Sequence, residues 1–214
     1  MDQLSRLGAL HSAVVADALD AFGLRDRTLA PGLVPLGGAG KVAGRAATLR
    51  VVAVDAVPAQ PYAVQFAAVD ALRPGDLMVV ETPPERPSAF WGELITTRAL
   101  VNGCVGALVD GYSRDVEQIR RRGFPLWARG THPADSAGRL DAVARDVAVT
   151  VGGVRVEPGD LVLADVDGVV VVPAARAGEV IAAAEAKARV EDTVRAELSG
   201  GRTIVETYAK HGVM

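Results

Sequence analysis

The chain has 214 residues, half of them apolar, which is enough for one generous domain with a sizeable core. Its formal charge is −3, with acidic and basic residues intermixed, and aromatic residues make up only 4%, so neither nucleic acid nor an anionic membrane is an expected partner. The single cysteine, Cys104, excludes an internal disulfide and a cysteine-based zinc site. We therefore expect one domain over residues 1–214, acting on a small molecule or another protein.

The first residues, MDQLSRLGAL, lack the basic start, apolar core and cleavage site of a secretory leader. The most apolar run, DGVVVVPAA, is too short to span a bilayer. A lone cysteine also fits a reducing compartment. These features predict a cytoplasmic protein.

The first third of the chain predicts a helix, a strand, a second helix and a second strand. Residues 3–22 place apolar side chains at steps of three and four, which is typical of one amphipathic helix, and Gly23 is its expected stop. A strand is expected at 47–55, after a connection rich in proline and glycine at 30–46. Residues 61–76 predict a helix that ends before Pro74, and residues 76–81 predict a short buried strand.

The remainder of the chain changes character at about residue 147. Helix 92–103, strand 104–111, helix 115–123 and strand 125–130 alternate as in an α/β layer. Residues 147–173 then hold three or four short β runs separated by glycine-rich turns. A long helix at about 174–198 and a shorter one at 204–210 complete the expected α/β fold.

Common cofactor motifs are absent. The glycines between residues 37 and 44 match neither a phosphate loop nor a dinucleotide-binding turn. His11, His132 and His211 lie far apart, so a histidine zinc site has little support. Asp17 is expected to fix the amino-terminal helix against a loop, and the DVDG sequence at 165–168 is interpreted as a plain turn.

The pair Arg114-Asp115 allows two interpretations. Asp115 can cap the next helix, with Gln118 completing a capping box, and Arg114 is then an ordinary surface residue. Alternatively, the pair belongs to a binding site together with residues 92–94, which begin the preceding helix. Free backbone N–H groups and the positive end of the dipole make such a helix start suitable for a carboxylate.

The spacing between Glu93 and Arg114 favours the second interpretation. Twenty residues separate them. The intervening helix carries the chain roughly 15 Å away, and the strand brings it back by roughly 20 Å. Glu93, Arg114 and Asp115 are therefore expected around one pocket at the end of a strand, where α/β proteins bind anionic ligands.

These segments resemble a known family. The stretches WGELITTRAL, GALVDGYSRDVEQI, GFPLWARG and VTVGGVRVEPGDLVLADVDGVVVVP are similar to the RraA-like group. That group contains the class II 4-hydroxy-4-methyl-2-oxoglutarate / 4-carboxy-4-hydroxy-2-oxoadipate aldolases, which also decarboxylate oxaloacetate. Its most specific element is an acidic residue, twenty intervening residues and Arg-Asp, here Glu93, Arg114 and Asp115, with Glu93 where better-known aldolases carry aspartate. The resemblance implies a β/β/α swivelling-domain-like fold and a homotrimer or homohexamer with sites between subunits.

The chemistry of such an aldolase assigns a role to each residue. Cleavage leaves a pyruvate enolate, and no lysine belongs to the cluster, so Mg²⁺ or Mn²⁺ is the expected cofactor. Asp115 is the candidate metal ligand, Glu93 acts on a water bound to that ion, and Arg114 donates to the C2 oxygen. The backbone of Gly92, Glu93, Leu94 and Ile95 would bind the substrate carboxylate.

The resemblance also implies a base for the C4 hydroxyl, a carboxylate on the long carboxyl-terminal helix of a neighbouring subunit. Glu191 matches it by position, with Asp192 as the adjacent alternative; a solvated helix face is the competing interpretation of both.

Three functional hypotheses are compatible with the sequence. The leading one is a metal-dependent lyase acting on 2-oxo acids. The second is a non-catalytic, protein-binding regulator of the ribonuclease E type, in which the pocket is vestigial. The third is an enzyme acting on some other small acid. Regulators that resemble this chain lack the complete acidic, Arg-Asp set, so its presence here favours the lyase.

Overall fold

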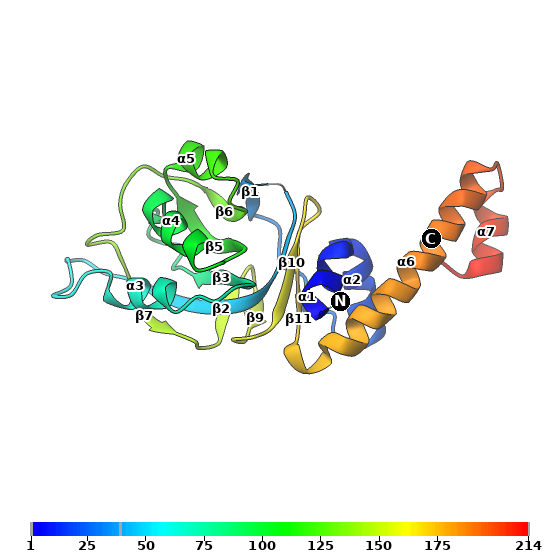
Figure 1. Cartoon of the computed structure of the whole chain (residues 1–214), viewed down its shortest axis with the longest axis horizontal. Helices are drawn as coiled ribbons and strands as arrows, with labels where there is room; N and C mark the ends of the chain where they lie inside the picture. Colours follow the sequence, from blue (N-terminus) through cyan, green and yellow to red (C-terminus); the bar gives the residue numbers. More distant parts are fainter. Residues whose placement is uncertain (1, 39, 214) are drawn as a thin grey trace.

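The computed structural model describes residues 2–38 and 40–213. Its main sheet contains, within these residues, β1 (Val34–Gly37), β2 (Val42–Ala53), β3 (Asp76–Glu81), β4 (Ala89–Trp91), β5 (Gly106–Ser113), β6 (Leu126–Thr131), β7 (Leu140–Arg145), β10 (Leu161–Ala164) and β11 (Val169–Val172). The strand order is β1-β6-β5-β3-β2-β10-β11, with β4 beside β5 and β7 beside β2 (Figure 1). A separate hairpin joins β8 (Val149–Val151) to β9 (Val154–Val156).

The helices are α1 (Gln3–Ala9), α2 (Ser12–Ala21), α3 (Ala63–Asp70), α4 (Glu93–Val101), α5 (Val116–Arg121), α6 (Ala177–Ser199) and α7 (Ile204–His211), with the 3-10 turn η1 (Ala174–Arg176) before α6. None of the helices in the described residues is long and apolar enough to cross a membrane.

The sheet is parallel at its centre and antiparallel at its sides. β2, β3, β5 and β6 run parallel, whereas β1, β7, β10 and β11 pair in the antiparallel sense. The strand β3 is buried along almost its whole length because helices cover one face and the small hairpin covers the other. The mixed α/β fold predicted from the sequence is thereby confirmed.

Three groups of buried side chains hold the layers together. One packs α3, α4 and α5 against the central strands, and it includes the large side chains Trp91 and Phe124. A second fills the opposite face of these strands, under β8 and β9. The third joins α1, α2 and α6 to the outer face of β10 and β11.

The predicted single helix at residues 3–22 is wrong, because the chain forms two helices, α1 and α2. The break comes at Leu10, whose backbone is extended. Asp165 explains why the second helix begins at Ser12. Its carboxylate accepts hydrogen bonds from the backbone N–H of Ser12 at 2.7 Å and from the Ser12 hydroxyl at 2.6 Å. The DVDG segment is thus a turn that also anchors α2. Asp17 likewise differs from expectation, since it pairs with Lys187 on α6 at 2.7 Å and not with a loop.

Smaller differences concern segments without clear periodicity. The helix expected at 61–76 spans only Ala63–Asp70. Strands β1, β4 and β7 were not predicted, because each is short or irregularly patterned. The expected short β runs of residues 147–173 are confirmed as β8, β9, β10 and β11.

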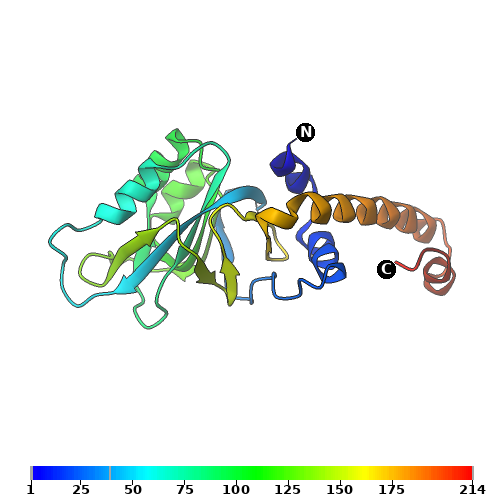
Figure 2. The same cartoon turned by 90° about the horizontal axis from the view of Figure 1, so that it is seen from below.

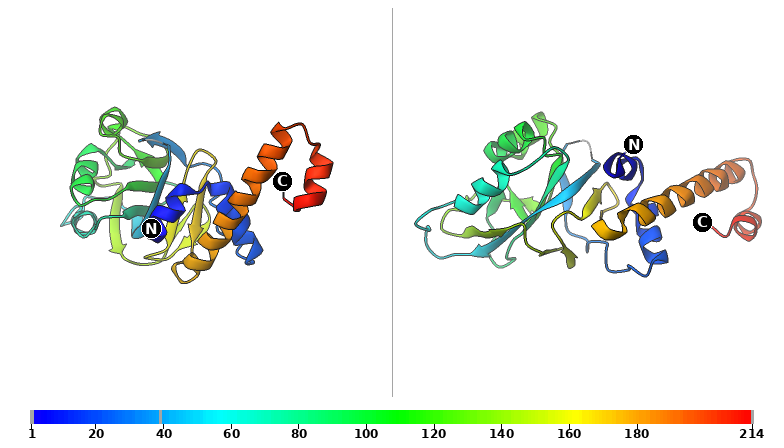
Figure 3. Two further views of the ribbon diagram at one scale, coloured as in Figure 1. Left: turned by 45° about the vertical axis from the view of Figure 1, so that its right-hand side comes forward. Right: turned by 60° about the horizontal axis from the view of Figure 1, so that its bottom comes forward.

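The carboxyl-terminal helices form an arm that projects from the sheet. The first part of α6 packs against α1 and α2, and the rest extends away from the strands (Figures 2 and 3). A turn returns α7 alongside the end of α6, where Glu197 faces Lys210, Arg202 and His211. Exposed apolar side chains on α7 include Ile204, Val205 and Tyr208.

Removing the Asp165 carboxylate should destabilise the fold in a pH-dependent way. Burial would raise the pKa of Asp165, but its hydrogen bonds with Ser12 and the loop backbone lower it below the ordinary value of 3.8. The carboxylate therefore stabilises the folded state above that value, and this contribution disappears as the pH falls through the lower, folded-state pKa. We expect Asp165→Ala to lower the free energy of unfolding at pH 7 by about 1–3 kcal/mol, measured by denaturant titration.

The exposed neighbour Asp167 provides the control, because Asp167→Ala leaves the Ser12 contacts in place. The difference between Asp165→Ala and the unmodified protein should shrink when the titration is repeated near pH 3. An equal loss of stability at both pH values would contradict the proposed role of the charge.

Candidate active site

The end of β5 lies against the beginning of α4. β4 runs parallel to β5 and leads directly into α4. The backbone N–H of Arg114 donates to the carbonyl oxygen of Trp91 at 2.9 Å, and the Ser113 hydroxyl donates to the same oxygen at 3.0 Å. The end of β5 is therefore in direct contact with the segment that leads into α4, as the spacing of Glu93 and Arg114 predicted.

Asp115 bridges the two segments through its side chain. It precedes α5 with a left-handed backbone, φ 57°, and makes no side-chain cap on that helix, so the alternative interpretation, a capping box with Gln118, does not hold. Its carboxylate instead accepts a hydrogen bond from the backbone N–H of Glu93 at 3.2 Å. Arg114 Nε lies 3.7 Å from the same carboxylate. The backbone turn thus directs Asp115 toward the free end of α4, where a negative charge is favoured.

Two residues outside the predicted set, Asp135 and Tyr62, also belong to the site. Asp135 Oδ1 lies 3.3 Å from Arg114 Nη2, and Asp135 Oδ2 accepts a hydrogen bond from the Tyr62 hydroxyl at 2.6 Å. Asp135 lies in a loop and Tyr62 precedes α3, so no periodicity points to either. The only available signal in the sequence is the polar loop RGTHPAD beside a strand end.

These side chains surround a cavity of about 270 Å³. Aromatic and apolar groups line much of it, and charged residues complete the lining. The lining residues are Tyr62, Gln65, Phe66, Ala89, Phe90, Trp91, Gly92, Glu93, Leu94, Ile95, Arg114, Asp115, Asp135 and Ser136. All predicted residues of the α4–β5 site are therefore brought together in this single chain.

The backbone N–H and the side chain of Glu93 have different partners. Its carboxylate accepts hydrogen bonds from the Thr97 hydroxyl at 2.8 Å and from Arg122 Nε at 2.7 Å. These two partners lower the pKa of Glu93 below its ordinary value, so the group is ionised at neutral pH. Glu93 lines the cavity, but Arg122 neutralises much of the charge of its side chain.

Charge within the site is balanced around Arg114. Burial would raise the pKa of Asp135, but the Tyr62 hydroxyl, the N–H of Ala137 and the charge of Arg114 together lower it. The hydrogen bond with Asp135, followed by burial, raises the pKa of Tyr62, so the phenol stays protonated and donates. One guanidinium therefore lies between two carboxylates, those of Asp115 and Asp135.

The donor set suits a hard cation held by few protein ligands. In the described residues, no three His, Cys, Asp or Glu side chains are close enough to form a metal cage. Asp115 nevertheless presents a carboxylate with 39% of its side chain exposed at the cavity. Mg²⁺ commonly binds to one or two carboxylates and keeps several waters, and Mn²⁺ accepts the same oxygen ligands. The residues present thus fit such an ion at Asp115.

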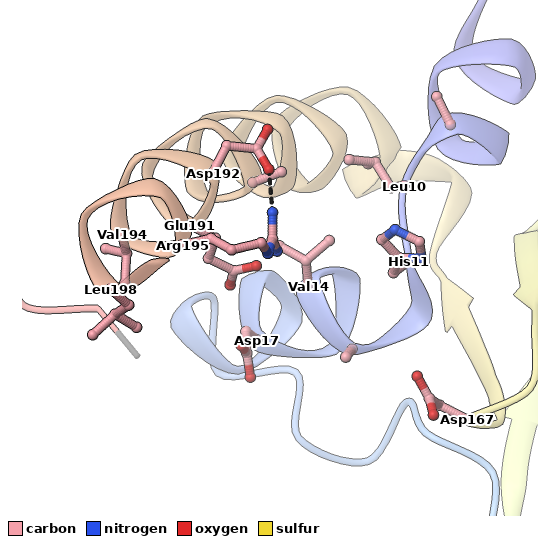
Figure 4. A pocket seen from close by; sticks show the side chains of 13 residues that line it. Leu10, His11, Val14, Asp17, Asp167, Glu191, Asp192, Val194, Arg195 and Leu198 are labelled. Atoms are coloured by element: carbon pink, nitrogen blue, oxygen red, sulfur yellow. Dashed lines mark hydrogen bonds and ion pairs between the residues drawn. The ribbon is translucent and has the colours of Figure 1, made fainter. Parts of the chain in front are cut away.

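Glu191 and Asp192 lie elsewhere in the chain. They line a larger cavity of about 710 Å³ between α6 and the α1–α2 segment, together with Asp17, His11 and Arg195 (Figure 4). α6 leaves the sheet on the side opposite α4 (Figures 1 and 2). Within one chain, Glu191 therefore does not reach the α4 cavity, and its predicted role in a neighbouring subunit stays a prediction.

Adding a methyl group at Gly92 should displace Asp115. A Cβ there would lie 2.9 Å from Asp115 Oδ2 and 3.4 Å from Arg114 Cγ. The backbone of Gly92 is extended, so alanine is not strained by its conformation. We expect Gly92→Ala to fold normally but to move the carboxylate away from the Glu93 N–H, as judged by a crystal structure of the variant.

Gly178→Ala, on α6, is the matched control, because the added Cβ would lie 3.6 Å from Gln3 Nε2, an ordinary contact. If Asp115 keeps its position in Gly92→Ala, the close approach of Gly92 to the Asp115 carboxylate does not constrain that side chain.

Comparison with known proteins agrees with this architecture. A protein of Halalkalibacterium halodurans named "Putative 4-hydroxy-4-methyl-2-oxoglutarate aldolase" is 29% identical over 97% of this chain and 94% of its own length. Protein DlpA of Legionella pneumophila is also 29% identical over 94% of this chain, but the chain spans only 32% of DlpA.

A solved structure has the same fold. Streptomyces coelicolor RraAS2, described as an unusual member of the RNase ES inhibitor RraA protein family, matches with a TM-score of 0.79 and 33% identity, over 90% of this chain and 95% of its own. The family model RraA-like, described as Aldolase/RraA, matches residues 12–171. The resemblance stated from the sequence is thereby confirmed, and the chain belongs to the RraA-like family.

Proposed function

We propose that this protein is a divalent-metal-dependent lyase that cleaves 4-hydroxy-2-oxo acids to release pyruvate and also decarboxylates oxaloacetate. One observation carries the proposal: the Arg114 guanidinium, the Asp115 carboxylate and the amino terminus of α4 meet in one cavity of about 270 Å³. The aldolase name of the relative from Halalkalibacterium halodurans supports the same reaction class.

Arg114 is the proposed electrostatic catalyst. When the C3–C4 bond breaks, its electron pair moves onto the pyruvyl half and negative charge grows on the C2 oxygen. A guanidinium is permanently charged and presents several fixed donors, so it interacts more strongly with this oxygen as the charge develops. Asp115 and Asp135 hold the guanidinium in place before substrate arrives, which reduces the reorganisation needed during the reaction.

The first turn of α4 is the proposed site for the substrate carboxylate. The first N–H groups of a helix have no partner within the helix. The N–H of Glu93 already donates to Asp115, which leaves those of Leu94 and Ile95 available. Their dipole and the neighbouring Arg114 favour an anion at this position.

Asp115 is the proposed ligand of Mg²⁺ or Mn²⁺. When bound, such an ion would act as a Lewis acid that stabilises the negative charge of the reacting 2-oxo acid. Glu93 would orient a water molecule at the edge of the cavity. For the C4 hydroxyl proton, Glu191 of a second copy of this chain, or the adjacent Asp192, is the proposed acceptor, in a homotrimer or homohexamer.

A second candidate function is a protein-binding regulator of the ribonuclease E type. The similarity to RraAS2, which belongs to an RNase ES inhibitor family, favours it. A regulator has no need for a guanidinium and a carboxylate converging at a helix start, so the intact Arg114-Asp115 pair favours the lyase.

Replacing Arg114 should slow enolate formation. The purified protein with Mg²⁺ should exchange the methyl protons of pyruvate for deuterium in D₂O, as followed by proton NMR. In Arg114→Ala, the rate should fall by about 10²–10³, the usual loss for one charge-stabilising donor. Arg121→Ala is the control, because Arg121 lies on α5 with 74% of its side chain exposed and pairs with Glu117. Equal exchange rates in the two variants would contradict the role of Arg114.

Removing the metal should stop oxaloacetate decarboxylation. We expect pyruvate production from oxaloacetate to disappear with a chelator and to return with Mg²⁺ or Mn²⁺, measured by a coupled assay. Asp115→Asn should raise the metal concentration needed for half-maximal activity, because a neutral amide is a weaker ligand for a hard cation. Undiminished activity in chelator would refute metal dependence.

A further inference from the structure

A left-handed backbone occurs twice in the lining of the α4 cavity. Among the described residues, three other than glycine have this conformation, Tyr62, Asp115 and Asp146, and the first two line the cavity. Aspartate adopts it readily, whereas it is unfavourable for a residue as bulky as Tyr62, whose φ is 66°. Such strain is retained where the surrounding contacts hold a side chain in a required position, so the contacts of Tyr62 indicate its role.

The hydroxyl of Tyr62 is linked to Arg114 through one intermediate, Asp135. The hydroxyl donates to Asp135 Oδ2 at 2.6 Å, and Asp135 Oδ1 lies 3.3 Å from Arg114 Nη2. Asp115 faces a different nitrogen of the same guanidinium, Nε, at 3.7 Å. Two carboxylates therefore restrain Arg114, and the Tyr62 hydroxyl orients one of them.

The backbone of Asp135 is fixed, so the orientation of its side chain depends on its hydrogen bonds. Asp135 pairs with Ala89 of β4 as an isolated β-bridge, and the Arg139 guanidinium donates to the Asp135 carbonyl at 2.9 Å. The carboxylate can still rotate about its side-chain bonds. Its Oδ2 accepts from the Tyr62 hydroxyl at 2.6 Å and from the N–H of Ala137 at 3.3 Å. The phenol is the shorter contact and thus the stronger restraint.

Tyr62 is itself held against the same strand. The buried Gln65 amide donates to the Phe90 carbonyl at 3.0 Å and ties α3 to β4. The ring of Tyr62 stacks on Phe66 with centroids 5.4 Å apart. All of these contacts lie within one chain, so they do not depend on which group of a second copy reaches the cavity.

We infer that Tyr62 is a positioning residue of the active site, which orients the Arg114 guanidinium through the Asp135 carboxylate. This role rests on the proposed function, in which the guanidinium stabilises the C2 oxygen of the enolate. A guanidinium that is already oriented needs little reorganisation as the charge develops. Loss of the restraint should therefore slow the chemical step more than it weakens substrate binding.

Removing only the Tyr62 hydroxyl tests this role, because Tyr62→Phe keeps the ring and its stacking on Phe66. In the Mg²⁺-loaded protein, we expect kcat for the exchange of pyruvate methyl protons to fall by at least about tenfold, while KM changes by less than about twofold. Tyr112→Phe is the matched control. It removes the same hydroxyl from a ring that faces His132 and lies outside the described lining of the cavity, so both constants should stay unchanged.

A second background shows whether Tyr62 acts through Asp135. Asp135→Ala should lower kcat, but the phenol then has no carboxylate to hold. Adding Tyr62→Phe to Asp135→Ala should therefore lower kcat further by less than about twofold. Additive losses of kcat, or a rise in KM in Tyr62→Phe, would mean that the hydroxyl acts on the substrate itself and would contradict the positioning role.

The crystal structure of Tyr62→Phe provides a readout that is independent of activity. We expect the Asp135 carboxylate to rotate and the Arg114 guanidinium to leave its position in an otherwise unchanged fold. A guanidinium that stays in place, or an exchange rate equal to that of the unmodified protein, overturns the inference and leaves the lyase function intact. Absence of exchange in the unmodified protein overturns the proposed function, and the inference with it.

Discussion

The hydrogen bond from the Arg114 N–H to the Trp91 carbonyl, 2.9 Å long, is the contact on which the candidate site depends. It holds the end of β5 beside the start of α4. Trp91 itself is buried, stacks on Phe124 with centroids 6.1 Å apart, and donates its indole N–H to the Thr96 hydroxyl. Because this anchor lies in the core, the exposed side chains of Arg114 and Asp115 extend from a fixed backbone.

The contacts that orient Arg114 also neutralise part of its positive charge. Arg114 lies between Asp115 and Asp135, so its guanidinium is oriented but partly neutralised before any ligand binds. Glu93 shows the same pattern, since Arg122 holds its carboxylate. In the proposed function, an anionic substrate would therefore interact with the helix amino terminus and with the proposed metal ion as well as with Arg114.

The amino- and carboxyl-terminal helices form a separate region from the cavity. α1, α2 and α6 pack on the outer face of β10 and β11, and the end of α6 with α7 projects beyond them (Figure 3). A single chain leaves the apolar side chains Ile204, Val205 and Tyr208 exposed on this arm. A carboxylate such as Glu191 could act at the α4 cavity only from another copy of the chain, as the proposed assembly requires.

The sequence alone determined the α/β class and the meeting of Glu93 with Arg114-Asp115, because helices and strands have a constant rise per residue and the lengths of α4 and β5 nearly cancel. Only the tertiary structure decided the break between α1 and α2, since Asp165 lies 153 residues from Ser12 in sequence. It also decided that Asp115 bridges to α4, because capping and bridging were equally compatible with the local sequence. Asp135 and Tyr62 joined the site for the same reason: residues outside regular elements carry no periodic signal, and long-range packing alone sets their positions.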